Sequence, residues 1–185
     1  MPVHNIEKQH KEWLKQEKIA KERSRPWLPL LDFNAGAAFS RVLDSFSPAP
    51  AVPVNLFFSI QDTLACIISC EDRAEIFIHV LLNHRSTPHE VYRHIIVHEL
   101  IHLAVPPVAV DGREVAHPEA FWEMEKQKSP ERHRVWTWVY CNFCSCLKTE
   151  KKNERIAVLR HWKRAYGNPG LTWEQCGAFC SDPLY

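Results

Sequence analysis

Three short apolar runs dominate the first half of the chain, and each is rich in Ile, Phe, Leu or Val. They span residues 54–60, 63–69 and 75–82. The polar residues 70–73 separate the last two runs and are typical of a turn. Runs of this length between short connections predict strands, and they favour antiparallel pairing of neighbours. We therefore expect a small, mostly antiparallel sheet.

Patterns typical of helices flank these runs. Residues 5–23 are highly charged and carry Glu–Lys pairs four positions apart, which predicts a charged N-terminal helix. Further helices are predicted over 31–46 and 118–127, and a basic one over 152–166. Residues 135–146 (VWTWVYCNFCSC) are instead rich in β-branched and aromatic residues, which predicts a strand that leads into cysteines. Together these elements predict an α+β fold.

The best-defined element is a helix that begins near residue 87 and ends before Pro106. Thr87 is followed three residues later by Glu90, which is the pattern of a capping box with Thr87 as N-cap. Pro88 then occupies the first helical position, where a proline is well tolerated. The chain order is therefore strand, short loop and capped helix.

The last turns of this helix carry an HExxH motif at residues 98–102. Four residues make just over one helical turn, so the imidazoles of His98 and His102 project from one face and can hold one metal ion. Glu99 adjoins the first of them and can accept a proton from a metal-bound water. The motif therefore predicts a zinc site with a general base.

A third protein ligand has to come from further along the chain. Position 108, six residues after His102, is a valine and supplies no ligand. His117 lies fifteen residues after His102 and begins the sequence His-Pro-Glu-Ala-Phe-Trp. The candidates are His117, Glu114, Glu119 and Glu123.

The segment around this motif resembles a known family. The chain resembles the SprT-like metallopeptidases in three features: the HELIH motif, a His fifteen residues after it, and Phe121 four residues after that His. The Spartan proteases, which degrade DNA–protein crosslinks, belong to that family. The resemblance covers about residues 30–145, with Pro118 where the family usually has glycine. It implies a compact zincin-like domain that binds peptide substrate along an edge strand, for which 75–82 is the candidate. It also implies zinc on His98, His102 and His117, with Glu99 as general base.

Seven cysteines are an odd number, and a cytosolic chain keeps its thiols reduced. Cys141 and Cys144 form a CxxC pair, and Cys176 and Cys180 form a CxxxC pair. These four side chains are candidates for a second, structural zinc, and a redox pair is the weaker alternative. Cys66 and Cys70 lie in the sheet region and are expected to be buried as small apolar side chains rather than to bind a metal.

Charge is unevenly distributed. Residues 44–125 carry twelve acids and four bases, whereas 126–164 carry eleven bases and three acids. The chain divides into a charged N-terminal helix (1–25), a metallopeptidase domain (26–134) and a Cys-containing, basic C-terminal appendage (135–185). The basic region is a candidate DNA-binding surface, and a solvated face without a partner is the alternative.

Composition limits the remaining possibilities. Hydrophobic residues make up 45% of the chain and charged residues 24%, which excludes global disorder. No apolar run approaches the ~20 residues of a membrane helix, and no signal sequence is visible, so we expect a cytoplasmic protein. The leading hypothesis is a zinc endopeptidase acting on protein, with protein bound to nucleic acid as a candidate substrate. The alternatives are a non-catalytic, zinc-containing nucleic-acid-binding or adaptor protein and a zinc hydrolase of small amides.

Overall fold

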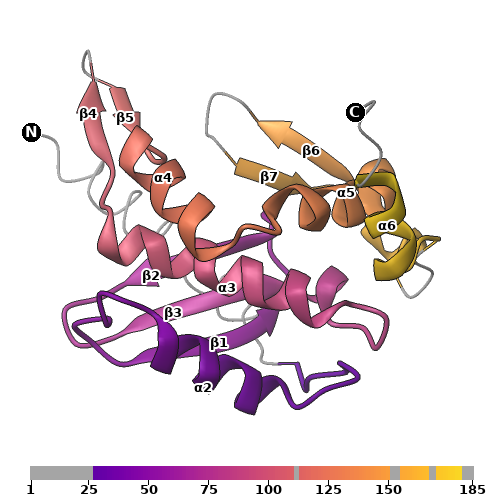
Figure 1. Ribbon diagram of the computed structural model, residues 1–185, viewed down its shortest axis with the longest axis horizontal. Coiled ribbons are helices and arrows are strands. Elements are labelled where there is room, and N and C mark those ends of the chain that lie inside the picture. The colour runs from indigo at the N-terminus through magenta and orange to yellow at the C-terminus, as the bar shows by residue number, and fades with distance from the viewer. Residues whose placement is uncertain (1–26, 111–112, 151–154, 167–169, 181–185) are drawn as a thin grey trace, which may run out of the picture.

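A three-stranded sheet lies in the lower half of the molecule as seen in Figure 1. The computed structural model describes residues 27–110, 113–150, 155–166 and 170–180, without the side chains of the last two. The strand order is β1 (Val54–Ser59), β3 (Ala74–His79) and β2 (Ala65–Ser69). β2 pairs antiparallel with β3, but β1 pairs parallel with it. The sheet is therefore mixed, because the chain after β1 crosses to the far edge before β3 returns between the two.

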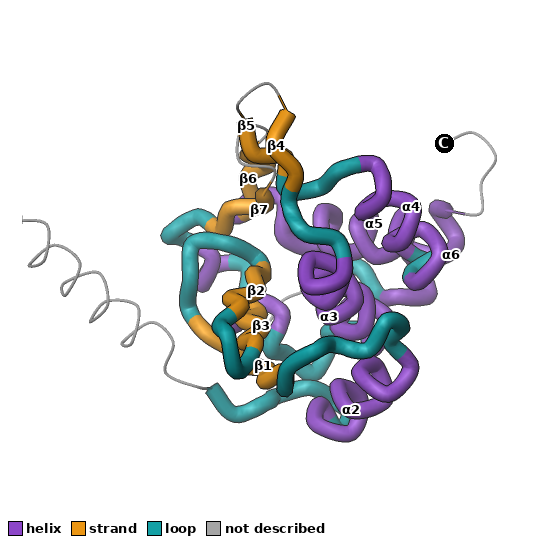
Figure 2. Tube along the Cα trace, turned by 90° about the vertical axis from the view of Figure 1, so that its left-hand side faces the viewer, coloured by secondary structure: helices purple, strands orange, loops and turns teal. Residues whose placement is uncertain are grey.

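Two helices cover one face of this sheet (Figure 2). They are α2 (Ala35–Ser45) and α3 (His89–Ala104), and α3 packs on both β2 and β3. α2 begins at Asn34, whose side chain accepts a hydrogen bond from the N–H of Ala37. The expected helix over 31–46 and the three expected strands are thus confirmed within a few residues. The expected helix over 5–23 lies outside the described residues.

The expected capping box at the start of α3 is wrong by one residue. Pro88 is the N-cap, with an extended ψ of 146°, and no side chain caps the helix. The hydroxyl of Thr87 is buried without a hydrogen-bond partner. Because the backbone at Pro88 is extended rather than helical, Thr87 lies too far from the first turn to bond its free N–H groups.

The remaining elements follow α3 along the chain (Figure 1). The hairpin of β4 (Val108–Val110) and β5 (Arg113–Val115) leads into α4 (Glu119–Lys128), as expected for 118–127. After it come α5 (Arg132–Phe143), the hairpin of β6 (Leu147–Glu150) and β7 (Arg155–Val158), and α6 (Trp173–Cys180). The α+β prediction is confirmed, and both hairpins are antiparallel. None of the helices in the described ranges combines the length and apolar character that crossing a membrane requires.

Two predictions for the C-terminal part are wrong. Residues 135–146 form most of α5 and a 3₁₀ turn rather than a strand, and the expected basic helix at 152–166 is replaced, in its described part, by β7 and a turn. In α5 the buried residues recur with helical spacing, namely Val135, Trp138, Val139 and Phe143. Packing of this stripe on the core outweighs the β propensity of the individual residues.

One hydrophobic core includes residues of both the expected metallopeptidase domain (26–134) and the expected C-terminal appendage (135–185). Val135, the first residue of the expected appendage, is fully buried in the same cluster as Ile95 of α3 and Phe121 of α4. The C-terminal residues Trp162 and Cys176 also belong to this cluster. The C-terminal segment therefore supplies part of the packing that holds α3 in place.

Replacement of Trp138 tests the helical assignment of α5. Trp138 is 1% exposed, so Trp138→Ala is expected to lower the free energy of unfolding by about 3–5 kcal/mol. Trp136→Ala is expected to cost about half as much or less, since Trp136 is only partly buried. Urea denaturation of both variants gives the comparison. Equal losses would contradict the helix, because a strand places residues 136 and 138 on one face.

His79, at the end of β3, predicts a loss of stability in acid. Its Nδ1 accepts a hydrogen bond from the N–H of Leu81, and burial lowers the pKa of the imidazole from 6.5 to about 4. The unfolded chain therefore binds a proton at a higher pH than the folded one, so the contribution is complete above pH 6.5 and is lost as the pH falls towards 4. The expected loss is about 3 kcal/mol.

Urea denaturation of the metal-free protein between pH 7 and pH 4 measures this loss. The matched variant is His79→Asn, whose side-chain oxygen keeps the acceptor for Leu81 but does not titrate. Its stability is expected to fall less steeply in this range. Identical slopes for the two proteins would exclude His79 as a source of the acid sensitivity.

Candidate metal centre

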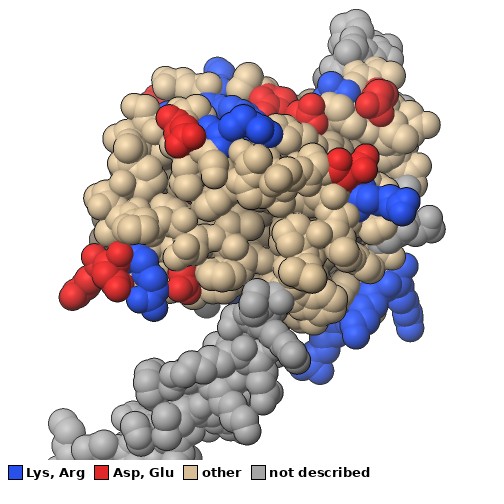
Figure 3. Space-filling model, turned by 90° about the horizontal axis from the view of Figure 1, so that it is seen from below, with Lys and Arg blue, Asp and Glu red and all other residues tan. Residues whose placement is uncertain are grey.

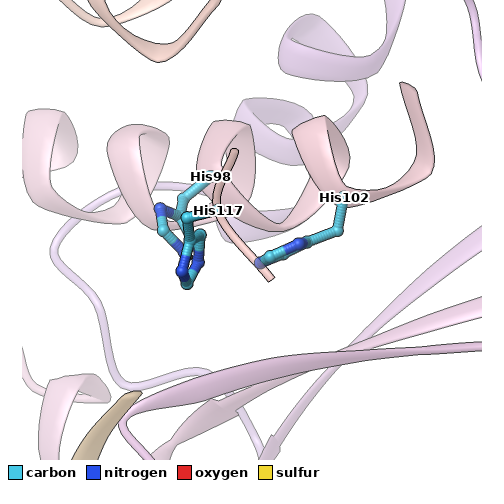
Figure 4. Close-up of side chains that lie close together, drawn as sticks. All are labelled: His98, His102 and His117. Carbon is cyan, nitrogen blue, oxygen red and sulfur yellow. The ribbon is translucent and has the colours of Figure 1, made fainter. Parts of the chain in front are cut away.

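α3 brings the two histidines of the HExxH motif to one face, as expected. The ring centroids of His98 and His102 lie 5.3 Å apart. Val91 and Ile95 precede them and are buried, which fixes the rotation of the helix about its axis. Both imidazoles extend from α3 towards the space above the strands (Figure 4).

His117 completes the group from the segment before α4. The Nε2 atoms of His117 and His98 are 3.3 Å apart, and the ligand nitrogens of all three histidines lie within 4.8 Å of one another. Nitrogens at about 2.0–2.1 Å from a tetrahedral zinc ion are roughly 3.3 Å apart. One pair of nitrogens thus has the spacing expected at a zinc ion, and the three histidines form a group that could hold a metal ion. The other candidates for third ligand, Glu114, Glu119 and Glu123, are not in this group.

Glu125 orients the first histidine. Its Oε1 lies 2.6 Å from Nδ1 of His98, and the carboxylate is fully buried and bonded by Nε of Arg132. Burial would raise the pKa of Glu125, but the hydrogen bond from His98 and the positive charge of Arg132 help to lower it. An ionised carboxylate only accepts, so Nδ1 of His98 carries the proton and Nε2 presents a lone pair to the metal.

Phe121 supports all three imidazoles. Its ring centroid lies 4.9 Å from that of His98, 4.7 Å from His102 and 4.6 Å from His117. Phe121 is fully buried in the first turns of α4. Trp122 packs on the outer side of His117 at 5.1 Å, and the Arg132 guanidinium lies 5.0 Å from the Trp122 ring. Arg132 therefore contacts both Glu125, which bonds His98, and Trp122, which packs on His117.

Burial sets the protonation of the site. It lowers the pKa of His102 to about 3, and the neighbouring His98 and His117 lower it further in the same direction. A neutral imidazole is the form that binds a metal. Glu99 is 4% exposed, and burial raises the pKa of its carboxyl to about 7, against the opposite effect of His98. A carboxyl with such a pKa is suited to take up and release a proton near neutral pH.

The three histidines and Glu99 line a cleft of about 980 Å³. One wall is β2, and consecutive residues from Thr63 to Ile67 line it, so the strand presents its edge and not one face. The prediction that residues 75–82 form the edge strand that binds substrate is wrong, because β3 is the central strand of the sheet and β2 is an edge strand. Central strands are apolar on both faces, and the run EIFIHVLL shows that pattern.

The hydrogen bonds at the two ends of β2 show which backbone groups face the cleft. The carbonyl of Leu64 accepts from the N–H of His79 at 2.8 Å, towards β3. The N–H of Cys70 donates to the carbonyl of Arg73 at 2.8 Å, towards the same side. Backbone groups alternate in direction along an antiparallel strand. The residues whose N–H and C=O groups point to the open edge are therefore Ala65, Ile67 and Ser69.

The candidate cysteine site is only partly described. Cys141 and Cys144 are exposed at the end of α5, and Cys176 is buried on α6. Among the side chains that the structure describes, these three do not form a group able to hold a metal ion. The side chain of Cys180 lies outside the described residues, so a second zinc stays a prediction.

Glu125 is a site residue that the sequence analysis missed. It follows Phe121 by four positions in a helix that was predicted correctly, so the two share a face. Phe121 and Glu125 are the two buried residues of α4. An acid on the buried face of the helix after His117 is the signal that would have identified it.

Comparison of the chain with protein-family models, curated proteins and solved structures finds no match.

Proposed function

We propose that this protein is a zinc-dependent endopeptidase. The observation that carries the proposal is the convergence of three histidine nitrogens within 4.8 Å, in a cleft that Glu99 also lines. Zinc held by these three histidines would supply Lewis acidity and would lower the pKa of a water molecule bound to it. Glu99 takes the proton from the attacking water and passes it to the leaving nitrogen. A site that held zinc only for structure would have no use for this buried base.

The open edge of β2 supports a peptide over a small amide as substrate. An extended chain can add to an edge strand through main-chain hydrogen bonds, and Ala65, Ile67 and Ser69 offer these bonds beside the metal centre. Such pairing does not depend on side chains, so it suits unfolded or exposed protein segments. This is also the substrate class that the resemblance to the SprT-like metallopeptidases implies.

Nucleic-acid binding by the basic region has less support. Arg132 and Arg155 pair with Glu125 and Glu150, so part of the positive charge is neutralised locally. The face seen from below in Figure 1, opposite β6 and β7, has its Lys and Arg towards the margins and none at its centre, so it adds no second basic surface (Figure 3). The alternative of a non-catalytic nucleic-acid-binding protein stays a prediction.

Removal of the metal tests the proposed function. The zinc-loaded protein is expected to cleave a fluorescently labelled, unfolded protein, and chelation is expected to abolish cleavage. Added Zn²⁺ should restore activity and Mg²⁺ should not, because imidazole nitrogens favour zinc over magnesium. The measurement is the rate of fluorescence release in the three states. Cleavage that persists after chelation, with no zinc left on the protein, would refute the proposal.

A further inference from the structure

The end of the cleft beyond β2 is walled by aromatic and apolar side chains. Trp136 and Tyr140 of α5 are four residues apart and therefore lie on one face of the helix, and both line the cleft. Ile156 of β7 lies beside them in the lining, and it pairs across the hairpin with Thr149. These side chains are partly buried yet face an open space that holds no protein atoms. We refer to Trp136, Tyr140 and Ile156 as the end wall.

Contacts on the far side hold the end wall in position. The hydroxyl of Tyr140 lies 2.9 Å from that of Thr149. The ring of Trp136 packs edge-on against the buried His94, with centroids 5.6 Å apart. The carbonyl of Ile156 accepts a hydrogen bond of 2.9 Å from the N–H of Leu64, just before β2 begins. The end wall is therefore formed in advance of binding, which limits the entropy lost when a ligand is held.

Trp136 of the end wall lies about one helical turn of α3 from the metal centre. Ile95, which also lines the cleft, precedes His98 by three residues, and Trp136 packs on His94, one turn before His98. Three residues of helix correspond to about 4.5 Å. Successive residues of an extended peptide are about 3.3 Å apart. A peptide on the edge of β2 would thus place a side chain against the end wall one or two residues from the bond at the metal.

We propose that Trp136, Tyr140 and Ile156 form a subsite that selects peptides with a large apolar or aromatic side chain next to the cleaved bond. This inference rests on the proposed function, since it assigns a specificity to the same cleft. Hydrogen bonding of Leu64 to β7 closes the edge of β2 at this end. Antiparallel pairing is the more stable arrangement, and an antiparallel peptide runs from Ser69 towards Ala65. The selected side chain is then on the C-terminal side of the cleaved bond.

The charges of the cleft favour an apolar side chain over a nucleobase. Besides the histidines, its charged lining residues are two acids, Glu99 and Glu125, and two bases, Arg132 and Arg155. Each of the two arginines has a carboxylate partner. A nucleic-acid strand needs unneutralised cations for its phosphates as well as aromatic rings for its bases. Among the lining residues that the structure describes, the aromatic rings come without such cations.

Binding to an inactive protein tests the subsite without requiring turnover. The probes are two blocked, extended peptides of Gly, Ser and Thr that differ only in Phe or Ala at one position. The protein is the zinc-loaded Glu99→Gln variant, and affinity is measured by calorimetry. The Phe peptide is expected to bind at least about tenfold more tightly, because the end wall removes the ring from water. Tyr140→Ala and Trp136→Ala, each added to Glu99→Gln, are expected to reduce this ratio to below about threefold.

Two further variants serve as controls. Tyr140→Phe keeps the ring and is expected to keep the preference. Trp27→Ala removes a 44% exposed tryptophan that does not line the cleft, and it is expected to change nothing. Circular dichroism checks that each variant is folded. If both wall variants retain the tenfold ratio, or if a short oligothymidine binds the cleft more tightly than the Phe peptide, the inference is overturned.

The outcomes for the subsite and for the proposed function are separable. If the wild-type protein cleaves unfolded protein but Glu99→Gln binds the two peptides equally, the subsite is refuted and the endopeptidase stands. If the wild-type protein cleaves nothing but the Phe preference is observed and depends on Tyr140, the subsite is supported as a binding site and the endopeptidase is refuted. Cleavage together with a Tyr140-dependent preference supports both.

Discussion

Replacement of Glu99 by glutamine is expected to reduce peptide hydrolysis by about 10²–10⁴-fold and to leave the zinc content unchanged. Glutamine has the shape of glutamate, but its amide cannot accept the proton of the attacking water. Glu99 is buried beside the cleft and is not among the three metal-binding side chains, so its loss removes the base and no ligand. Steady-state cleavage of an unfolded protein and metal analysis of the purified variant measure the two effects.

The control for this prediction is Glu90→Gln. Glu90 lies in the first turn of the same helix, two turns before His98, and does not line the cleft. Its replacement removes an equal charge and is expected to leave cleavage within about twofold. A Glu99→Gln variant that binds zinc and cleaves at the wild-type rate would exclude Glu99 as the general base.

Replacement of Glu125 by glutamine is expected to weaken zinc binding by about 10–100-fold. The carboxylate fixes Nδ1 of His98 as the protonated nitrogen and lowers the cost of sharing the Nε2 lone pair with a cation. Glutamine keeps the size of the side chain but removes the charge that His98 and Arg132 contact. The dissociation constant, measured by competition with a chromophoric chelator, gives the effect.

Glu123→Gln is the matched control for Glu125. It changes an exposed acid on the same helix, which should leave the zinc affinity unchanged. Glu125 is only 1% exposed and accepts from two donors, so Glu125→Gln is also expected to destabilise the metal-free protein, and urea denaturation of that protein accompanies the zinc measurement. An unchanged zinc affinity in Glu125→Gln would show that the 2.6 Å contact with His98 does not tune the metal site.

Local sequence patterns were sufficient for the parts of the site that depend on short spacing. The distance between His98 and His102 is set by the helix itself, and the apolar pattern around them, which ends before Pro106, identifies that helix. His117 was a candidate because its residue type and position fit a third ligand, and the structure places it beside His98 and His102 in a group that could hold a metal ion. The fold class followed from the same kind of evidence, since the runs of β-rich residues are short and separated by polar turns.

Features that depend on long-range pairing were not predictable in the same way. The position of β3 between β1 and β2 is set by contacts between strands. The residues 75–82 by themselves do not indicate which strands pair with them on either side. The pattern of α5 was ambiguous, because Val, Trp, Thr and Tyr favour strands while the spacing of Val135 and Trp138 favours a helix. Packing against α3 decided between them.

The continuity of the core across residue 134 bears on how this protein can be divided. The ligands come from residues before that point, whereas Trp136, Tyr140 and Ile156 come after it. A fragment ending there would retain every metal ligand and lose the packing of Val135 and Trp138 against the helix that carries them. The proposed metal site and the proposed subsite therefore share one hydrophobic core, and we expect that neither would keep its structure if the chain were divided at residue 134.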